Sequence, residues 1–512
     1  MRLPYFTLVL ILPAVALRAE HHVTVVTKEG RQSGALSAEQ MEVKTNAGVT
    51  KVPLAEVASV HFGDTDVVHT RQGKRVKGTV KVEGWVLKEK DAERPVGREG
   101  LRFLVPQASV GRAKKGQIVD AASGNGMTYH VRLPEKYDPA KGGPAIVLLH
   151  GSNANSADYV KGVTQRWPKV AADYVLIGID GEWPAGKDPD GPPAYNYTYV
   201  NFVGKSKYKG FPGTDRESPA LVAETLAEIK EQLKLFRVFV TGHSQGGFLA
   251  YSCLMNYPDL FDGAMPIAAG LIFQCEPSAY EDADIRRRQR ERPLAIVHGE
   301  QDPLVSVSMG KAAYESFLAD GFPMLRLFAA KGAGHAFISL PFEEAIRWLE
   351  SMTVDDPRAL LKSAERAFAA REYRDACAYL RRAQDLDKKK ASAAAAGALR
   401  RKIEQLAAKP AKSLEAAIRK NDGTGWVSEF DSFRRQFEFT DAAAGVMAGY
   451  NKLRAVHEPA AEKRWSDARR AFSKGDREQG YRICEEIVKE HYASSYFRYA
   501  KQTLEGRRAG AP

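Results

Sequence analysis

The pattern of hydrophobic and polar positions changes twice along the chain and divides it into three regions. Residues 21–105 alternate apolar and polar positions over short segments, and a period of two residues predicts β-strands. Residues 117–352 hold short, continuously apolar runs separated by amphipathic stretches, which is typical of buried strands that alternate with helices. From residue 355 onward the apolar positions follow the helical period and alanine becomes frequent. We therefore expect three regions of different structural class.

The first region contains an internal repeat. The segment HVTVVTKEG at residues 22–30 is echoed by DVVHTRQG at residues 66–73, and each copy continues with a second glycine, Gly34 or Gly78. Further alternating segments follow in each copy. We predict that residues 21–111 form a duplicated small all-β module, as tandem β-barrels or β-sandwiches. Since no catalytic signature occurs in this module, a binding or spacer role is the simplest interpretation.

The central region predicts an α/β fold. After a polar linker at residues 112–123, strand-like runs alternate with helical stretches, and this alternation indicates a mostly parallel sheet covered by helices on both faces. The runs are residues 129–133, 145–149, 174–179, 237–240, 263–268, 294–297 and 324–328. We place this domain at residues 117–352.

The last region, residues 355–508, predicts an all-α structure. An amphipathic helix over residues 359–368 meets a second helix through a short turn, and residues 462–489 repeat this helix–turn–helix plan. Paired helices of this kind resemble tetratricopeptide repeats. We expect these helices to contact a protein or envelope partner.

One short motif in the central region carries candidate chemistry. Residues 242–246 read Gly-His-Ser-Gln-Gly and fit the pattern G-x-S-x-G. Residues 235–240 predict a strand before the motif, and residues 248–255 predict a helix after it that Pro258 ends. A sharp strand–turn–helix strains the backbone at the serine and exposes its hydroxyl, so Ser244 is the candidate nucleophile. The alternative is a glycine-rich turn with an incidental serine.

A serine hydroxyl becomes a good nucleophile only when a histidine takes its proton and an acid orients that histidine. In hydrolases of the order Ser–acid–His, both partners follow the serine at strand ends. Asp302 lies in the turn after the strand at residues 294–297, with Glu300 as the rival acid. His335 follows Asp302 within the central region, and we assign it as the base. Two further histidines are interpreted as structural, His243 and His298.

The buried strand at residues 145–149 ends in a His-Gly turn ahead of the serine motif. Such a turn can present one backbone N–H to a developing oxyanion, and the residue after the nucleophile presents the other. We expect the N–H groups of Ser152 and Gln245 to form this oxyanion hole, with Asn153 as the alternative first donor.

The motifs LLHGSNAN, TGHSQGGFLAYSC, VHGEQDPLVSV and GAGHAF, in this order, resemble the α/β-hydrolase superfamily over about residues 125–350. The resemblance is closest to secreted carboxylic-ester hydrolases of the feruloyl esterase and polyhydroxybutyrate depolymerase type. It implies a serine esterase with the triad Ser244, Asp302 and His335 and without a cofactor. One position departs from the family pattern, because Ser152 stands where a cysteine often follows the His-Gly pair.

Charge and cysteine content change this picture little. The formal net charge of +12 is concentrated after residue 353, where basic and acidic residues interleave on predicted helix faces. We therefore expect solvated surface rather than nucleic-acid binding. Four cysteines are too few for a disulfide scaffold, although Cys253 and Cys275 are able to pair in an oxidising compartment. No spacing of cysteine and histidine predicts a metal site.

The N-terminus predicts export. Arg2 precedes an apolar run over residues 6–12 and small residues up to Ala16 or Ala19, the features of a signal peptide at residues 1–19. The run is too short to span a membrane, and an uncleaved anchor is the alternative. We expect a secreted or periplasmic protein.

A long insert follows Asp180 and is the candidate substrate-binding loop. Its aromatic residues suit an aryl ester or a sugar face, or else they pack the insert onto the core. They are Trp183, Tyr195, Tyr197, Tyr199, Phe202, Tyr208 and Phe211. Esters that decorate plant or algal polysaccharides are the leading hypothesis for the substrate.

Two other functions remain open at this point. A serine peptidase related to the prolyl oligopeptidases shares the motif order, although residues 21–105 are too short for the propeller of such enzymes. A non-catalytic scaffold is the third hypothesis. Because all candidate catalytic groups lie within residues 115–352, we expect this fragment to fold and hydrolyse small esters alone, unless the helices cover an apolar face of it.

Overall fold

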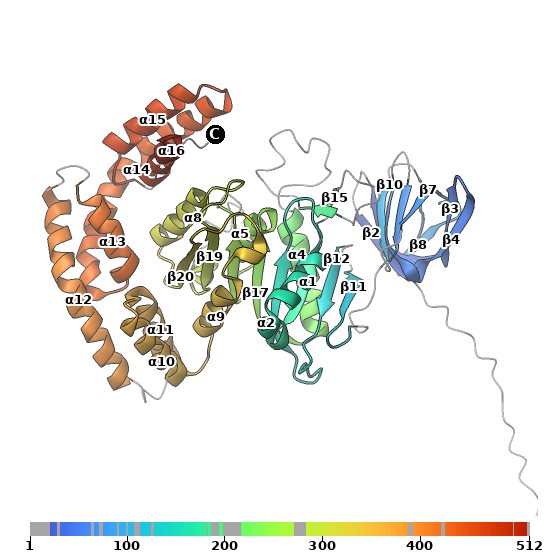
Figure 1. The fold of residues 1–512 in the computed structure, drawn as a ribbon, viewed down its shortest axis with the longest axis horizontal. Coiled ribbons are helices and arrows are strands. Elements are labelled where there is room, and N and C mark those ends of the chain that lie inside the picture. The colour runs from blue at the N-terminus through green and yellow to red at the C-terminus, as the bar shows by residue number, and fades with distance from the viewer. Residues whose placement is uncertain are drawn as a thin grey trace, which may run out of the picture. The chain divides into compact units, whose positions relative to one another are not determined.

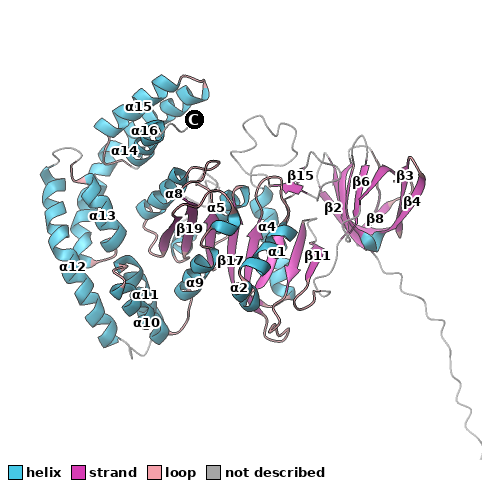
Figure 2. Cartoon of the chain, viewed as in Figure 1, coloured by secondary structure: helices cyan, strands magenta, loops and turns pink. Residues whose placement is uncertain are grey.

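The structure is a computed structural model and is drawn in Figures 1 and 2. It describes residues 21–508 except 28–30, 63–65, 71–74, 90–91, 99–100, 107–112, 124–126, 182, 186–193, 198–216, 271–282, 388–392, 421–424 and 495. The chain divides into two compact units. The first is Met1–Ser109 with Ala122–Gly126, and the second is Val110–Ala121 with Met127–Pro512. The predicted signal peptide lies outside the described residues.

The first unit is built from strands, which confirms the all-β prediction. They are β1 (His21–Thr27), β2 (Arg31–Leu36), β3 (Gln40–Thr45), β4 (Gly48–Pro53), β5 (Val57–His61), β6 (Asp66–Thr70), β7 (Arg75–Val80), β8 (Val86–Glu89), β9 (Ala92–Pro95) and β10 (Leu101–Pro106). Their order in the sheet is β4-β3-β7-β6-β5-β10-β1-β2-β8-β9. Alternate residues of these strands are buried in one core, which includes Val23, Val43 and Val68.

The two copies of the repeat interlock in this sheet. Each strand of the first copy (β1–β5) has a counterpart five strands later in the second copy (β6–β10). Replacing every strand in the sheet order by its counterpart gives the same order read from the other end. The exchange is visible in the pairing, because β3 of the first copy pairs with β7 and β2 pairs with β8. The sequence predicts two modules in tandem, and the structure differs because each copy completes the sheet of the other.

The second unit contains the mostly parallel sheet that the sequence predicts. Its strands are β11 (Ile118–Ala122), β12 (Thr128–Arg132), β13 (Gly143–Leu149), β14 (Val175–Ile179), β17 (Leu235–His243), β18 (Gly263–Ile267), β19 (Leu294–Gly299) and β20 (Leu325–Ala330). The order is β11-β12-β14-β13-β17-β18-β19-β20. All seven predicted strands are present, with β12 antiparallel to β14 and parallel pairing from β14 to β20. β11 lies at the end of the stretch predicted as linker, where the short, mostly apolar segment IVDAA follows the polar residues 112–117.

Helices cover both faces of this sheet (Figure 2). One layer contains α1 (Ser156–Arg166), α2 (Pro168–Asp173) and α9 (Phe342–Met352), and Trp167 stacks on Phe342 within it. The other contains α4 (Glu217–Gln232), α5 (Gln245–Asn256) and α8 (Val307–Ala319), where Tyr251 stacks on Phe317. A further helix, α7, spans Ala283–Arg290, and a hairpin joins β15 (Trp183–Ala185) to β16 (Ala194–Asn196).

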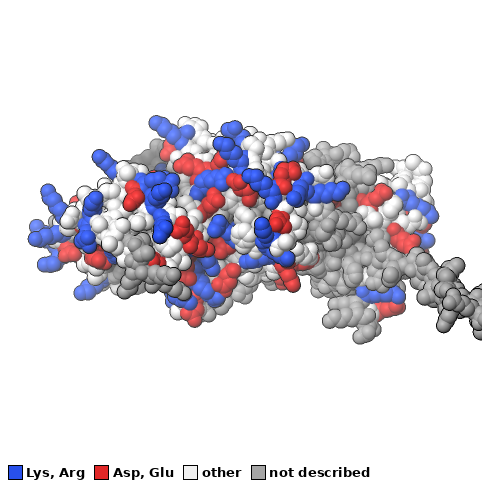
Figure 3. All heavy atoms as spheres, turned by 90° about the horizontal axis from the view of Figure 1, so that it is seen from below, with Lys and Arg blue, Asp and Glu red and all other residues white. Residues whose placement is uncertain are grey.

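The C-terminal region is all-α, as predicted. It consists of α10 (Pro357–Ala369), α11 (Tyr373–Leu386), α12 (Ala393–Lys420), α13 (Val427–Phe437), α14 (Ala444–Ser473), α15 (Arg477–Glu490) and α16 (Tyr496–Arg508). The pairs α10–α11 and α14–α15 pack against each other, whereas α12 and α14 are long helices with an internal proline. No described helix meets the length and hydropathy that a membrane span requires. Figure 3 shows Lys and Arg side chains interspersed with Asp and Glu on the face it displays.

The helical region and the α/β region share one hydrophobic core. Leu349 of α9, Leu360 of α10 and Leu380 of α11 belong to the same buried cluster. At its edge the indole N–H of Trp348 donates to Asp375 Oδ2 at 2.9 Å, and Arg326 of β20 pairs with the same carboxylate at 3.0 Å. The helices therefore bury the outer surface of α9 rather than standing apart from it.

Two buried arginines of the C-terminal helices donate hydrogen bonds to backbone carbonyl groups near the end of α8. Arg434 donates to the carbonyl of Leu318 at 2.6 Å, and Arg374 donates to the carbonyl of Phe322. Both guanidinium groups lie 3.1 Å from Glu438, which supplies the negative charge that buried arginines need. The Leu318 carbonyl also accepts from the Gly321 N–H at 3.1 Å, and Phe322 follows α8, so the arginines add donors to carbonyl groups at and just after the helix end.

We expect the fragment 115–352 to aggregate or to unfold at a much lower temperature than the full chain, contrary to the expectation from the sequence. Removing residues 353–512 exposes Trp348, Leu349 and Met352 and removes the arginine donors of the Leu318 and Phe322 carbonyls. The measurement is thermal unfolding followed by circular dichroism and light scattering. A fragment 110–512, which keeps the whole second unit, is the matched control and should melt cooperatively. A monomeric, stable 115–352 fragment would contradict the shared-core interpretation.

Candidate active site

Ser244 occupies a strained turn between β17 and α5. Its dihedral angles are φ 53° and ψ −117°, in a region that residues with a side chain rarely adopt. The backbone at this turn is held by a hydrogen bond of 2.9 Å from the Ser244 N–H to the carbonyl of Ile267. The strain predicted for a nucleophile turn is therefore present at the serine itself.

Glycines around Ser244 are required by the close approach of other backbone segments. A Cβ atom at Gly242 would lie 2.2 Å from the Gly246 carbonyl oxygen, and one at Gly246 would lie 2.3 Å from the carbonyl oxygen of Leu149. A Cβ at Gly247 would lie 2.5 Å from the carbonyl oxygen of Ile267. These distances exclude any other residue without movement of the sheet, which explains the glycine-rich motif.

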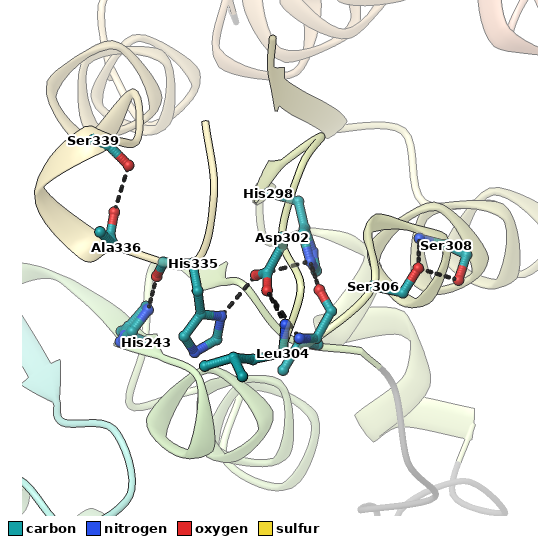
Figure 4. Close-up of polar contacts among 10 residues, drawn as sticks. His243, His298, Asp302, Leu304, Ser306, Ser308, His335, Ala336 and Ser339 are labelled. Carbon is teal, nitrogen blue, oxygen red and sulfur yellow. Dashed lines mark hydrogen bonds and ion pairs between the residues drawn. The ribbon is translucent and has the colours of Figure 1, made fainter. Parts of the chain in front are cut away.

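Asp302 and His335 come together at the carboxyl ends of β19 and β20 (Figure 4). Asp302 Oδ2 lies 2.7 Å from His335 Nδ1, while Oδ1 accepts hydrogen bonds of 2.9 Å from the N–H groups of Leu304 and Val305. The Asp302 carboxylate is fully buried, and the His335 side chain is 16% exposed. The carboxylate thus fixes the tautomer with a proton on Nδ1 and leaves Nε2 to accept a proton.

The rival acid, Glu300, is exposed to solvent at the end of β19. Its neighbour Gly299 meets the loop that carries His335, because a Cβ at Gly299 would lie 2.3 Å from the Gly334 carbonyl oxygen. The loop itself turns at Gly332, whose φ of 75° requires glycine. The geometry favours Asp302 over Glu300 as the partner of His335.

His298 is buried beneath the acid turn. Its Nε2 donates to the carbonyl of Val305 at 2.8 Å and lies 3.6 Å from Asp302 Oδ2. Burial lowers the pKa of His298, so the ring is neutral at pH 7. His298 therefore supports the turn that holds the Asp302 carboxylate.

His243, next to the nucleophile, connects the loop of His335 through Tyr159 of α1 to the turn after β13. Its Nε2 donates to the carbonyl of His335 at 2.7 Å, so its Nδ1 is the acceptor and takes a hydrogen bond of 2.7 Å from the Tyr159 hydroxyl. The Tyr159 oxygen in turn accepts from the N–H of Gly151 at 3.1 Å. The rings of His243 and His335 lie 4.7 Å apart between centroids. The sequence predicts a structural role for His243 but gives no signal of this network.

We expect the substitution His243→Ala to lower kcat by about 10- to 100-fold, because the loop of His335 loses its backbone anchor and a displacement of about 1 Å is enough for this loss. His243→Gln keeps an N–H donor and should recover part of the activity. Steady-state kinetics on a soluble p-nitrophenyl ester measure the effect, with KM expected to change little. Full activity of His243→Ala would contradict this anchoring role.

The same histidine predicts a pH dependence of stability. Burial lowers the pKa of His243 to about 4, from about 6.5 for an exposed histidine. Between these values the unfolded chain binds the proton that the folded chain excludes, so stability falls as the pH decreases from about 6.5 to about 4. Urea unfolding at several pH values should show a shallower decline for His243→Gln. An identical decline in both proteins would contradict this assignment.

The two predicted oxyanion donors carry N–H groups that no described residue accepts. Ser152 lies exposed in the turn after β13, and Gln245 is the first residue of α5. The alternative donor is engaged elsewhere, since the N–H of Asn153 donates to Asn196 Oδ1 at 2.9 Å. Asn153 also has φ 55°, which turns the chain after Ser152. The structure therefore favours Ser152 over Asn153.

Part of the aromatic insert is a structural clamp. The Tyr197 side chain is only 3% exposed, and its hydroxyl accepts from the His150 N–H at 3.0 Å and donates to the Ile179 carbonyl at 2.5 Å. Its backbone exchanges two hydrogen bonds with the side-chain amide of Gln245, at 3.1 and 3.2 Å. Tyr197 thus holds both turns that carry the predicted oxyanion donors. Most other aromatic residues proposed for substrate binding, Tyr199, Phe202, Tyr208 and Phe211, lie outside the described residues.

Neither a disulfide nor a Ser–His hydrogen bond is present among the described residues of this site. Cys253 is free and buried in α5, which raises the pKa of its thiol, and Cys275 lies outside the described residues. Ser244 makes no hydrogen bond with His335, although His335 lies against the neighbouring His243. Such contacts are often long in enzymes without substrate and tighten when it binds.

The comparison with known families decides the class of chemistry. Residues 121–306 match the family model described as "Putative esterase". The protein is a carboxylic-ester hydrolase. The matched segment includes Ser152, Ser244, Gln245 and Asp302, and His335 follows it on the next strand–loop unit. No curated protein matches the chain in sequence.

Several solved esterases resemble this esterase in structure. A thermostable esterase is 15% identical, with 65% of this chain and 89% of that chain covered and a TM-score of 0.33. The carboxylesterase of Bacillus cereus is 15% identical over 44% and 92%, with a TM-score of 0.30. Acyl-protein thioesterase 2 of Zea mays is 16% identical over 43% and 97%, with a TM-score of 0.31.

Proposed function

We propose that this esterase uses Ser244 as the nucleophile, His335 as the general base and Asp302 as the acid that orients it. The observation that carries this proposal is the hydrogen bond of 2.7 Å between the buried Asp302 carboxylate and His335 Nδ1, beside a serine held at φ 53°. A neutral His335 with its proton on Nδ1 has one free nitrogen, Nε2, for the serine proton.

The reaction proceeds in two halves. As the Ser244 oxygen attacks the ester carbonyl, its proton moves to His335 Nε2, and the Asp302 carboxylate stabilises the imidazolium that forms. The tetrahedral intermediate expels the alcohol, which takes the proton back from Nε2 and leaves an acyl group on Ser244. A water molecule then repeats these steps and releases the carboxylic acid.

Two backbone N–H groups stabilise the negatively charged oxygen of the tetrahedral intermediate. The N–H groups of Ser152 and Gln245 are the donors, and the positive end of the α5 dipole adds to their effect. Asn196 and Tyr197 hold the two donor segments through the hydrogen bonds described above. Because the donors are fixed before substrate binds, the developing charge meets groups that do not have to reorient.

For the substrate we propose carboxylic esters linked to polysaccharides or to aryl groups, as in feruloyl esterases and polyhydroxybutyrate depolymerases. The support is the order of the sequence motifs and the aromatic residues of the insert. The apolar run after Arg2 supports export to the periplasm or the medium, where such polymers occur.

The test combines labelling and a substrate panel. We expect a fluorophosphonate probe to modify the protein once, at Ser244, as shown by peptide mass spectrometry. Purified full-length protein should hydrolyse p-nitrophenyl esters and methyl ferulate but not peptide anilides. Hydrolysis of anilides alone would favour the peptidase alternative. Absence of labelling together with inactivity on every ester would overturn the serine mechanism.

A further inference from the structure

A cleft of about 1100 Å³ lies between the edge of the esterase sheet, which is formed by β20, and the C-terminal helices. Its walls come from α8 and β20 on one side and from α11, α13 and α16 on the other. All of these elements belong to the second unit. The cleft is separate from the catalytic residues, since none of Ser244, Asp302 and His335 lines it.

One wall of the cleft is an unpaired strand edge. β20 is the last strand of the sheet and pairs only with β19. The Leu294 N–H donates to the Met324 carbonyl, and the Glu300 N–H donates to that of Ala330. In a parallel pair alternate residues bond to the neighbouring strand, so the even-numbered residues of β20 face β19.

Leu325 and Leu327 therefore direct their backbone N–H and C=O groups away from β19. Both residues line the cleft, and no described residue accepts from or donates to these groups. Leu325 is only 1% exposed, so the half-buried Leu327 is the edge residue that a ligand can reach. A strand edge with free backbone groups is a template for a further strand.

The charge of the cleft favours an acidic ligand. Six Lys and Arg residues line it, against four Asp and Glu residues. The acids are engaged with cations of the cleft, as Arg326 pairs with Glu372 and Asp375, Arg435 pairs with Glu315, and Asp431 interacts with Arg435. Three exposed cations form no ion pair with any described residue, namely Lys311 of α8, Arg371 before α11 and Lys501 of α16.

We propose that this cleft binds an extended acidic peptide segment of a partner protein, which adds to β20 as a strand at Leu327. The peptide backbone pairs with the free edge groups, and its acidic side chains meet Lys311, Arg371 and Lys501. The site gives the C-terminal helices a function that the ester chemistry does not require, and it holds whether or not the triad assignment is correct.

The test uses the full chain and a fluorescent ten-residue peptide of alternating Glu and Val, with binding measured by fluorescence anisotropy at low ionic strength. Two isomers of this peptide are methylated on backbone nitrogen atoms. In one isomer every Glu backbone N–H is methylated, and in the other every Val backbone N–H is methylated. Strand addition uses the N–H groups of only one set. We expect one isomer to bind at least tenfold more weakly and the other to bind like the parent peptide.

Charge reversal provides the second arm. The triple variant Lys311→Glu, Arg371→Glu, Lys501→Glu should lose at least tenfold in affinity while it hydrolyses p-nitrophenyl esters normally. The matched control reverses three exposed lysines elsewhere on the same unit, Lys136, Lys161 and Lys169, and should bind as the wild type does. The proposal is wrong if the parent peptide does not bind, if both methylated isomers bind equally, or if an oligogalacturonate binds the cleft and the peptide does not.

Discussion

Replacing Ser244 with alanine should reduce ester hydrolysis by about 10⁴-fold or more, and His335→Ala should reduce it to a similar level. The two residues act as one proton-transfer unit, so the loss of either removes the covalent route. The expected measurement is kcat for a p-nitrophenyl ester. The double variant should be no worse than either single variant, because nothing of the unit remains after the first substitution.

The backbone strain at Ser244 provides a control that separates chemistry from folding. Alanine keeps a Cβ at φ 53° and should leave thermal stability close to that of the wild type. Glycine adopts these dihedral angles without strain, so Ser244→Gly should be inactive yet more stable, by about 1 kcal/mol or more. Near-normal turnover by Ser244→Ala would refute the serine mechanism, and a less stable Ser244→Gly would refute the strain.

Asp302→Asn should lower kcat by about 10⁴-fold, because an amide permits the wrong tautomer of His335 and no longer stabilises the imidazolium. The Asp302 side chain is fully buried and accepts two backbone hydrogen bonds on Oδ1, which an asparagine carbonyl oxygen can retain. The site geometry should therefore survive the substitution. Kinetics on the same p-nitrophenyl ester measure the effect.

Glu300→Gln is the matched control for Asp302→Asn. Glu300 is two residues away in the same turn but is exposed, so its substitution should change kcat by less than a factor of about two. If Glu300→Gln proves the more damaging of the two, the acid of the triad has been assigned to the wrong carboxylate.

Much of the fold was open to prediction from sequence, because local patterns carry it. Buried parallel strands read as continuous apolar runs, and all seven runs between residues 129 and 328 are strands. The candidate site was open to prediction for a related reason. Strand ends place their loops at one edge of a parallel sheet, so an ordered set of serine, aspartate and histidine motifs after strands meets there.

The glycines of the nucleophile motif show what a sequence pattern predicts about a turn and what it does not. The pattern predicts a tight turn at Ser244, and the structure shows why it is required, since Gly242 and Gly246 lie against carbonyl oxygens of neighbouring segments. The sequence can indicate that space is short, but only the coordinates show which atoms occupy it.

By itself the sequence determined the region classes, the strand order along the chain and the residues able to form a triad. Only the tertiary structure favours Ser152 over Asn153, because the N–H of Asn153 is taken by Asn196, which is far away in sequence. It also made His243 an anchor of the His335 loop and merged the helices with the esterase core. The periodicity of a sequence indicates which face of a helix or strand is buried. The contacts of Asn153, of His243 and of the C-terminal helices depend instead on which atoms from distant parts of the chain meet that face. No local sequence pattern contains this information.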